Sequence, residues 1–596
     1  MLDFPEDEMK KSILLRQLFR STFITMTLVE LSNTVSCVVD GLVTGRLLGG
    51  EQMAAYGLAA PYFSIASIVS GILMVGGQNL CAKCLGSGDK EGANKAFSTF
   101  CIAGTVLSVV LAVFGILFSD RIAMLFGARG EYAHLLPYTS SYLKGLFAGT
   151  PFFVMLAVLA PIVQLDGGSK KANLASAMVA VVDIAADLIG VFVFKGGLLV
   201  VAIATSLSYA VALAVLLTHF AKKSAGFRFN VRDYDSAVAG TVLKVGMPRG
   251  ASMLCRAIGP IVINMIVLRV GRTVGMTAMS VQSNVKFFLG APSCGIAGAV
   301  LLLSSLYEGE KDKVLLRETM MVSLKYTGVI IMGMAAGAFC LARVIADLYL
   351  PDDAYAAEIA TAAIRWYTVS LPLMTINISL AGFLQAIGRT GGSYLMNIGS
   401  ELVFVVSSVI VLSGLFGLTG VWAAFAVGQL LLLVAYLISA LLRKEKVSVR
   451  MDRFLFLRDD FGVSDDNRFS VSVKSMEDVA ALSVNVEKFC TDRGIEKKRS
   501  FLTALFVEEL AGNVIEHGFN DGRKHQLETV VTVDNGEVII HLGDDCRKFD
   551  LKEKAENWKL DPEHPEENVG IRMVLGMAKD VSYAGAMNTN NVIVKI

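Results

Sequence analysis

The chain has 596 residues, of which 54% are hydrophobic and 18% are charged, and it contains 55 glycines. This mixture is too apolar and too rich in glycine for an ordinary water-soluble protein, so most of the chain is expected to lie in a membrane. The net charge is +1, and the nine cysteines follow no spacing that indicates a disulfide framework.

Apolar runs of about 20 residues, the length that crosses a bilayer as a helix, recur throughout the first three quarters of the chain. We place about twelve spans near residues 22–46, 53–81, 94–118, 138–163, 172–194, 197–220, 240–268, 277–303, 318–343, 359–385, 393–415 and 419–442. The loops after the even-numbered spans carry most of the lysines and arginines, such as Lys170 and Lys171. By the positive-inside rule we expect both ends of this region in the cytoplasm.

The two halves of the predicted membrane region resemble each other. QLDGGSKKA begins at Gln164 and QAIGRTGGS at Gln385, which aligns Gly167 with Gly388, and the charged turn GSGDK corresponds to YEGEKDK. Each half holds an even number of spans, so the halves have the same orientation and a substrate path is expected between them. The pattern predicts lobes at residues 1–220 and 221–443. The alternative is that hydrophobic helices resemble one another without being repeats.

Three carboxylates interrupt the apolar runs of the first half. Asp183 and Asp187 lie in VVDIAADLIG, and Asp40 lies in VVDGLVTGRLLG. An Asp at the centre of a spanning helix costs about 2.5–3.5 kcal/mol, so it usually faces a polar interior. Residues four apart lie about 6 Å apart on one helical face, where two carboxylates cannot both ionise cheaply. We expect a site that holds a proton or cation, with Thr205 as a further oxygen ligand. Pairing or the capping of a kinked helix is the alternative.

The second half carries charges at membrane depth, including Arg256 and Arg365. Lys286 and Glu401 are candidates for the lining of a substrate cavity, and structural pairing between the lobes is the alternative.

The segments DGLVTGRLLG from Asp40, GLAAPYFSIASIVSGILMVGGQNLCAKCLGSGDKEGA and PIVQLDGGSKKA together resemble the multidrug and toxin extrusion (MATE) transporters, over residues 15–443. The resemblance implies an all-α fold with two pseudo-symmetric six-helix lobes that alternate access. It also implies a cation site with an Asp in the first helix, an Asn and an Asp in the fifth, and a Thr in the sixth. These roles fall on Asp40, Asp183, Asp187 and Thr205. Asp183 replaces the Asn, which leaves the choice between H⁺ and Na⁺ open.

The function that this resemblance implies is antiport, in which cation entry drives export of small, cationic or amphipathic organic compounds across the cytoplasmic membrane. Two other functions stay open. One is a flippase for lipid-linked precursors, which would favour extra helices and a strongly cationic cavity. The other is a membrane-anchored sensor or kinase that acts on a protein partner.

After Arg443 the composition changes to that of a soluble α/β domain. Residues 444–467 read as a charged linker, and residues 468–596 as the domain. FSVSV predicts a strand, residues 476–491 and 496–519 predict helices, and LETVVTVDNGEVIIHLGD predicts a hairpin that turns at residues 534–536. A helix over residues 569–579 and two closing strands complete a single sheet with helices on one face.

The stretch ALFVEELAGNVIEHGF places Glu509 and Asn513 one helical turn apart, and a carboxylate and a carboxamide so placed can hold Mg²⁺ and orient a hydroxyl group. Together with HLGDDCRKFD and ENVGIRMVLGMAKDV, it resembles the Bergerat-type (histidine kinase-like) ATPases, most closely the anti-sigma-factor serine kinases. The resemblance implies that Glu509 is a general base, Asn513 the Mg²⁺ ligand, Asp544 the adenine-binding residue and Gly570 a phosphate-binding residue.

The chain departs from this second pattern at two places. Cys546 stands where a Gly is usual, and Asn568-Val569-Gly570 replaces Gly-x-Gly. Because no P-loop motif is present, we expect ATP to regulate transport or a partner rather than to power transport. A module that kept the fold without nucleotide is the alternative. The expected partners are the bilayer, a small-molecule substrate and a protein for the domain, and no nucleic acid.

Overall fold

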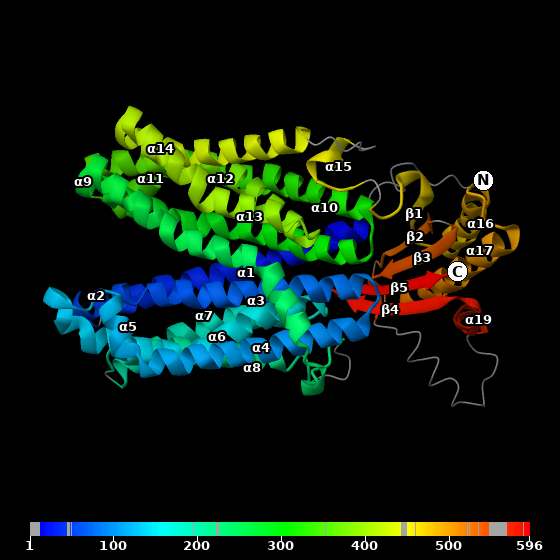
Figure 1. The fold of residues 1–596 in the computed structure, drawn as a ribbon, viewed down its shortest axis with the longest axis horizontal. Helices are drawn as coiled ribbons and strands as arrows, with labels where there is room; N and C mark the ends of the chain where they lie inside the picture. The colour runs from blue at the N-terminus through cyan, green and yellow to red at the C-terminus, as the bar shows by residue number, and fades with distance from the viewer. Residues whose placement is uncertain are drawn as a thin grey trace.

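The computed structural model describes residues 12–44, 48, 50–194, 196–221, 226–351, 353–442, 450–458, 461–520, 522–523, 525–534, 536–547, 569–587 and 589–596. They form a long bundle of helices with a small sheet domain at one end (Figure 1).

The first lobe, the N-lobe, is built from eight helices. They are α1 (Ile13–Val43), α2 (Gly50–Leu58), α3 (Pro61–Gly86), α4 (Lys90–Leu117), α5 (Ser119–Leu125), α6 (Leu136–Leu165), α7 (Ser169–Phe192) and α8 (Leu198–Leu217). Helices α6, α7 and α8 pack on one another, and α1 packs on α7. Short 3₁₀ segments, Gly130–Leu135 and Val231–Asp233, lie in the connections.

The second lobe, the C-lobe, follows from Ser236. Its helices are α9 (Ser236–Gly309), α10 (Lys313–Tyr326), α11 (Met332–Tyr349), α12 (Ala354–Ala386), α13 (Thr390–Ile398) and α14 (Phe404–Leu441), with π-helical turns η4 (Thr327–Ile331) and η5 (Gly399–Val403). The chain leaves helical geometry at Arg272 (φ 49°) inside α9 and at Gly417 (φ 60°) inside α14. Each of these helices therefore bends back. Helix α9 contains two predicted spans, and the continuous stretch of α13, η5 and α14 contains two more.

Nine helical stretches of the described chain are long and apolar enough to cross a membrane. The longest has 74 residues, a length of about 110 Å if straight, which exceeds the bilayer core of about 30 Å and requires the kink at Arg272. The two kinked stretches supply two spans each, and α1 adds a further helix of 31 residues. The prediction of about twelve spans in an all-α bundle is confirmed.

Two turns at the domain end of the bundle support the internal repeat. In the N-lobe, Gly88 has φ 76° and Asp89 accepts from the Gly92 N–H at 2.8 Å to cap α4. In the C-lobe, Lys311 has φ 56° and Asp312 accepts from the Val314 N–H at 2.9 Å to cap α10. We call Ser87–Lys90 the N-lobe turn and Gly309–Lys313 the C-lobe turn. The same backbone shape and the same cap at aligned positions indicate one structural unit used twice.

The soluble domain is a five-stranded antiparallel sheet with strand order β1-β2-β3-β5-β4. Its strands are β1 (Arg468–Val473), β2 (Leu527–Asp534), β3 (Glu537–Asp544), β4 (Asp580–Ala586) and β5 (Thr589–Lys595), and its helices are α16 (Met476–Asp492), α17 (Lys497–Asn513) and α19 (Val569–Met577). A π-helical turn (Val514–Gly518) extends α17. The sheet with helices on one face is confirmed. In the predicted linker, a short helix α15 (Arg450–Phe454) is described, whereas residues 444–449 and 459–460 lie outside the described chain.

Alternation along the strands gives the sheet two different faces. Val531, Ile540, Leu542 and Val594 point into a core shared with α16, α17 and α19. The residues between them, such as Val530, Thr532 and Ile539, face the transporter and line the space between the two parts. Figure 1 shows the sheet lying between its own helices and the end of the bundle.

Candidate functional site

The predicted carboxylates of the N-lobe are buried together. Asp40 lies near the end of α1 and is 3% exposed, and Asp183 and Asp187, on α7, are each 0% exposed. Thr205 of α8 is 2% exposed. Helix α7 packs against both α1 and α8, and Asp40 interacts with both acids of α7. The structure therefore brings the four residues of the predicted cation site together.

Two serines that the sequence reasoning missed complete this cluster. Ser36 and Ser208 lie beside Asp183, together with Thr205. The hydroxyls of Thr205 and Ser208 donate to backbone carbonyls, at 3.1 Å to Val201 and 2.7 Å to Thr205. Ser36 is one helical turn before Asp40, and Ser208 follows Thr205 by three residues, so the helical period was a signal that points to both.

The cluster is rich in oxygen atoms that need a positive partner. Both carboxylate oxygens of Asp183, both of Asp187 and Oδ1 of Asp40 have no hydrogen-bond partner within the described chain. Buried carboxylates without donors are costly, and they are stabilised by a proton or a bound cation. The hydroxyl groups of Thr205 and Ser208 donate to backbone carbonyls, so their oxygens remain available as acceptors, whereas Oγ of Ser36 has no partner within the described chain. The residues present therefore fit either coupling ion.

The charged residues of the C-lobe form a separate group. Arg256 of α9 pairs with Glu401 of the π-helical turn η5, with Nε and Oε1 3.4 Å apart. Lys286 and Arg249 lie close enough to interact with this pair, and Glu30 of α1 lies on the N-lobe side of Arg249 and Arg256. The Arg256–Glu401 ion pair lies within the C-lobe and does not join the two lobes. Lys286 lies near Glu401, as is expected if both residues line the same cavity.

Of the residues predicted for a nucleotide site in the soluble domain, the structure brings Glu509 and Gly570 into contact. Glu509 and Asn513 lie on α17 and are half-buried, and Gly570 lies at the start of α19. A side chain on Gly570 would begin only 1.8 Å from Oε2 of Glu509, so the glycine permits this close approach. Asp544 ends β3 and is 3% exposed. Its Oδ1 accepts hydrogen bonds from Nδ2 of Asn590 at 2.7 Å and from the Cys546 N–H at 2.9 Å.

This arrangement fits the groups that Mg-ATP presents. Burial raises the pKa of Asp544, and a buried carboxyl group anchored on one oxygen is suited to recognise the amino group of a base. The amide oxygen of Asn513 is a ligand type that Mg²⁺ binds, and Glu509, the predicted base, lies one turn away on α17. Asn568 and the preceding residues from 548 lie outside the described chain, as does the side chain of Val569.

Comparisons with known proteins agree with both parts. The sequence model of the MatE family matches residues 25–189 and 248–410, more than half of the chain. The chain belongs to the MatE family. Residues 473–596 match the Histidine kinase-like ATPase domain, so this MATE transporter carries an ATPase-like domain at its C-terminal end.

Two curated relatives carry the name Multidrug export protein MepA. The protein of Staphylococcus aureus is 26% identical over 422 residues, which cover 69% of this chain and 91% of the relative. That of Staphylococcus haemolyticus is 25% identical over 404 residues, covering 67% and 87%. Neither match covers the whole of this chain.

Solved structures show the same MATE fold. A multidrug resistance MATE transporter of the MOP superfamily in an outward-facing conformation has a TM-score of 0.67 at 23% identity, covering 71% of this chain and 94% of that chain. MATE in the bent conformation gives 0.65 at 24% identity, covering 71% and 96%. A MOP superfamily transporter from Pyrococcus furiosus, described as having a binding pocket of reverse polarity, has a TM-score of 0.66 at 23% identity, covering 72% of this chain and 97% of that chain.

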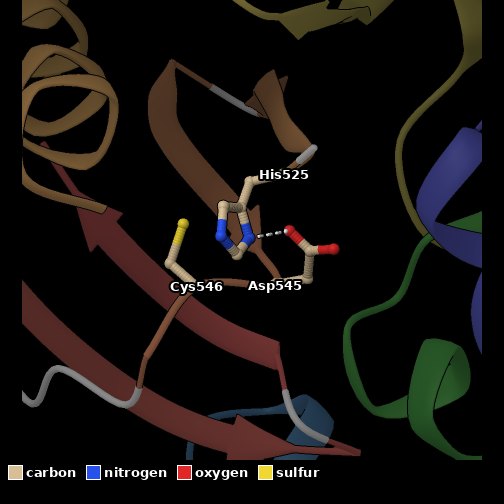
Figure 2. A group of neighbouring side chains, drawn as sticks. All are labelled: His525, Asp545 and Cys546. Carbon is tan, nitrogen blue, oxygen red and sulfur yellow. Dashed lines mark hydrogen bonds and ion pairs between the residues drawn. The ribbon is translucent and has the colours of Figure 1, made fainter. Parts of the chain in front are cut away.

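A third group of polar side chains follows Asp544 directly in this MATE protein and consists of His525, Asp545 and Cys546 (Figure 2). His525, Asp545 and Cys546 place one ligand atom each within 4.8 Å of the others, and Nδ1 of His525 is 3.1 Å from Oδ1 of Asp545. The same oxygen accepts the Gln526 N–H at 2.8 Å. These bonds fasten the start of β2 to the end of β3, which explains the cluster structurally. The sequence reasoning missed it, although the register Leu527↔Asp544 of the predicted hairpin places its residues opposite each other.

Proposed function

We propose that this MATE protein is a cation-driven antiporter that exports small organic compounds, and that its ATPase-like domain regulates transport. The observation that carries the proposal is the buried group of Asp40, Asp183 and Asp187 with Thr205. Three acids with unpartnered oxygens in one membrane lobe form a site for a proton or Na⁺, and their repulsion makes occupancy by a positive ion favourable. The extra acid at Asp183 suits either ion.

In this proposal the cation and the substrate use the two lobes in alternation. Binding of the ion neutralises the acids and shifts the balance between the two orientations of the lobes, because an ion can move that equilibrium only by its difference in affinity for them. The relatives' name, Multidrug export protein, points to drugs as cargo, and we propose small cationic or amphipathic compounds, with Lys286 and Glu401 as the lining residues. The excess of lysine and arginine in the loops at the domain end supports a cytoplasmic location for that end and for both ends of the chain.

The proposed organisation has four parts. Residues 1–220 and 221–443 form the lobes, residues 444–467 link them to the domain, and residues 468–596 form the domain. We propose that Asp544, Asn513 and Gly570 hold Mg-ATP, that Glu509 is its general base, and that the transporter part of the same chain is the protein partner. Bound ATP supplies a charged phosphate group to this site, while the ion gradient powers transport.

Purified full-length protein in sealed vesicles tests this proposal. An imposed pH or Na⁺ gradient is expected to drive a fluorescent organic cation across the membrane without ATP. Comparison of the two gradients identifies the ion. A chain that serves only as a sensor moves no dye under either gradient, and that result would reject the transport proposal.

A second candidate, a flippase for anionic lipid-linked precursors, is favoured by one observation. Arg249, Arg256 and Lys286 supply three positive charges in the interlobe region, against the two negative charges of Glu30 and Glu401. A fluorescent anionic lipid analogue in the same vesicles separates the candidates. Its translocation in the absence of any ion gradient, without movement of the cationic dye, would favour the flippase.

A further inference from the structure

The two lobes touch backbone to backbone towards the end of the bundle that carries the soluble domain. A side chain on Gly76 of α3 would begin 2.0 Å from the Val242 carbonyl oxygen of α9, and one on Gly246 of α9 would begin 1.9 Å from that of Ile72. Small residues permit such close helix contact in membranes. The ion pair between Lys83 and Glu308, 3.0 Å long, joins the same two helices near their ends. The lobes are therefore closed on the domain side.

The soluble domain contacts the N-lobe through its last two strands. Ser582 of β4 packs against Gly88 in the N-lobe turn, and the ammonium group of Lys90 lies 4.8 Å from the ring centre of Tyr583. The tip of the β4–β5 hairpin reaches the end of α6, where the Met587 N–H donates to the Leu165 carbonyl oxygen at 2.5 Å. Met587 is 6% exposed and belongs to the same apolar cluster as Leu165.

The same sheet contacts the C-lobe at the equivalent turn. Asp312 caps α10 with Oδ1, while its Oδ2 accepts from Nε and Nη2 of Arg468, at 3.0 and 2.9 Å. Arg468 begins β1, and both side chains are 10% exposed. Asn591 of β5 donates to Oε1 of Glu310 at 2.7 Å. One rigid sheet thus contacts both lobes, including the two turns that the internal repeat relates.

The joint between sheet and transporter combines polar and apolar contacts around a cavity. The cavity has a volume of about 270 Å³, which is large enough to hold water. Its lining mixes Lys313 and Lys595 with Glu528 and His541. The ion pair of Arg468 with Asp312, hydrogen bonds and the buried Met587 together give a mixed contact like that of transient interfaces, so it is suited to form and release.

We propose that the ATPase-like domain is a clamp that holds the two lobes together on its own side of the membrane. The clamp deepens the proposed function and rests on it. Because the lobes must separate on this side for the transporter to open there, the sheet must release at least one lobe in every cycle. The docked domain therefore favours the conformation that is open on the opposite side, and it slows transport.

The nucleotide site lies on the other face of the clamping strands. Asn590 donates to Asp544 on the nucleotide side, and its neighbour Asn591 bonds Glu310 on the transporter side. Asp545 follows Asp544 and accepts from Nε2 of Gln17 in α1 at 3.5 Å. Any shift of the end of β3 or the start of β5 on nucleotide binding is thereby transmitted to the clamp contacts, which is where regulation by ATP would act.

Reversible chemical links test the clamp in the full-length protein. One cysteine pair, Ser87→Cys with Ser582→Cys, joins the N-lobe turn to the domain, since Ser582 packs against Gly88, the neighbour of the exposed Ser87. The other, Glu310→Cys with Asn591→Cys, joins the C-lobe to the domain. A short bis-methanethiosulfonate reagent makes the links, and a thiol reductant removes them. The treated parent chain controls for its own nine cysteines.

Transport is measured with a fluorescent cationic dye in vesicles. We expect each single link to leave transport running, because the domain then travels with one lobe, and both links together to stop it until the reductant is added. Asp580→Cys with Lys595→Cys, a link within the domain, is the matched control and should have no effect. Transport that continues with both links in place, or stops with one, overturns the clamp.

A second measurement tests the clamp proposal without a transport assay. Spin labels on Ser87→Cys and Lys311→Cys report the distance between the two turns. Arg468→Gln should increase the population of separated lobes about tenfold, which corresponds to about 1.4 kcal/mol, whereas Lys488→Gln on the outer helix α16 should not. A parent chain that moves no dye contradicts the transport function alone. Unchanged distances in Arg468→Gln contradict the clamp.

Discussion

Replacing Asp187 by Asn gives the sharpest test of the cation site, because it removes one charge and keeps the shape of the side chain. Asp183 and Asp187 are fully buried and one helical turn apart, and neither has a hydrogen-bond partner in the described chain. At about 6 Å and an effective dielectric constant of about 20, each charge contributes about 3 kcal/mol to the attraction of a bound cation. Losing one charge should weaken cation binding about 100-fold.

The same substitution should make the protein more stable when no cation is bound. A buried carboxylate is costly, and Asn removes the charge and its repulsion with Asp183 and Asp40. We therefore expect a higher Tm for Asp187→Asn at neutral pH and low Na⁺, together with loss of ion-driven transport. A substitution that only disrupts the fold would lower both the Tm and the transport rate. A higher Tm together with lost transport therefore indicates that the charge of Asp187 serves function at a cost in stability.

The assay is gradient-driven dye transport in vesicles, with the ion concentration varied to obtain the half-saturating value. Asp347→Asn is the matched control, since Asp347 is half-exposed and pairs with Arg343 one turn away. Membrane insertion and expression should be unchanged in both variants. Full coupling at unchanged ion concentration in Asp187→Asn would refute the assignment of this cluster as the coupling site.

Three further predictions concern the domain and the lobe contact. Asp544→Asn should weaken binding of a fluorescent ATP analogue by tenfold or more, because a hydrogen bond to a charged group contributes about 1.5–3 kcal/mol, while Asp580→Asn should bind normally; equal affinities contradict the adenine role. Burial first, and then Asp312, raise the pKa of Glu310 from 4.5 to about 8. The docked joint thus retains a proton that the released one loses, so docking should weaken as the pH rises from about 5 to 8. In spin-label distances, Glu310→Gln should reduce this dependence, and Glu310→Gln with Glu528→Gln should reduce it further, because burial also raises the pKa of Glu528, to about 7. Gly246→Ala should lower the Tm, since its methyl group would overlap the Ile72 carbonyl oxygen, whereas Gly240→Ala has nothing within 4 Å and should not; equal Tm values would exclude the close contact.

Most of the fold was predictable because each spanning helix and each hairpin must meet a physical requirement that leaves a pattern in its own short stretch of sequence. A spanning helix must satisfy every backbone group internally, so a run of about 20 apolar residues predicts both its structure and its location. The hairpin around residues 534–536 was predictable because its flanking strands alternate and its turn carries Asp and Gly. The sequence predicted only breaks between spans near Arg272 and Gly417. The positive φ angles at these two residues depend on how the helices pack and were not predictable.

The candidate sites were predictable in part. A buried Asp in an apolar helix is conspicuous, so Asp40, Asp183 and Asp187 were identified one by one, and helical period placed two of them on one face. Ser36 and Ser208 were missed because small hydroxyl residues are common in membrane helices and carry no signal on their own. The Arg256–Glu401 pair joins residues far apart in the chain, and a sequence does not give the distance between two helices.

The amino-acid sequence by itself determined the spans, the repeat, the strand order within the hairpin and the residue types of both sites, because these depend on neighbours along the chain. Only the tertiary structure decided that Asp40 meets the acids of α7, and that the sheet rests on the C-lobe, through Arg468 and Asn591, and on the N-lobe turn, through Ser582. Contacts of this kind depend on the packing of whole helices and sheets. Their free energy comes from burial shared by distant segments, and no short stretch of sequence contains it.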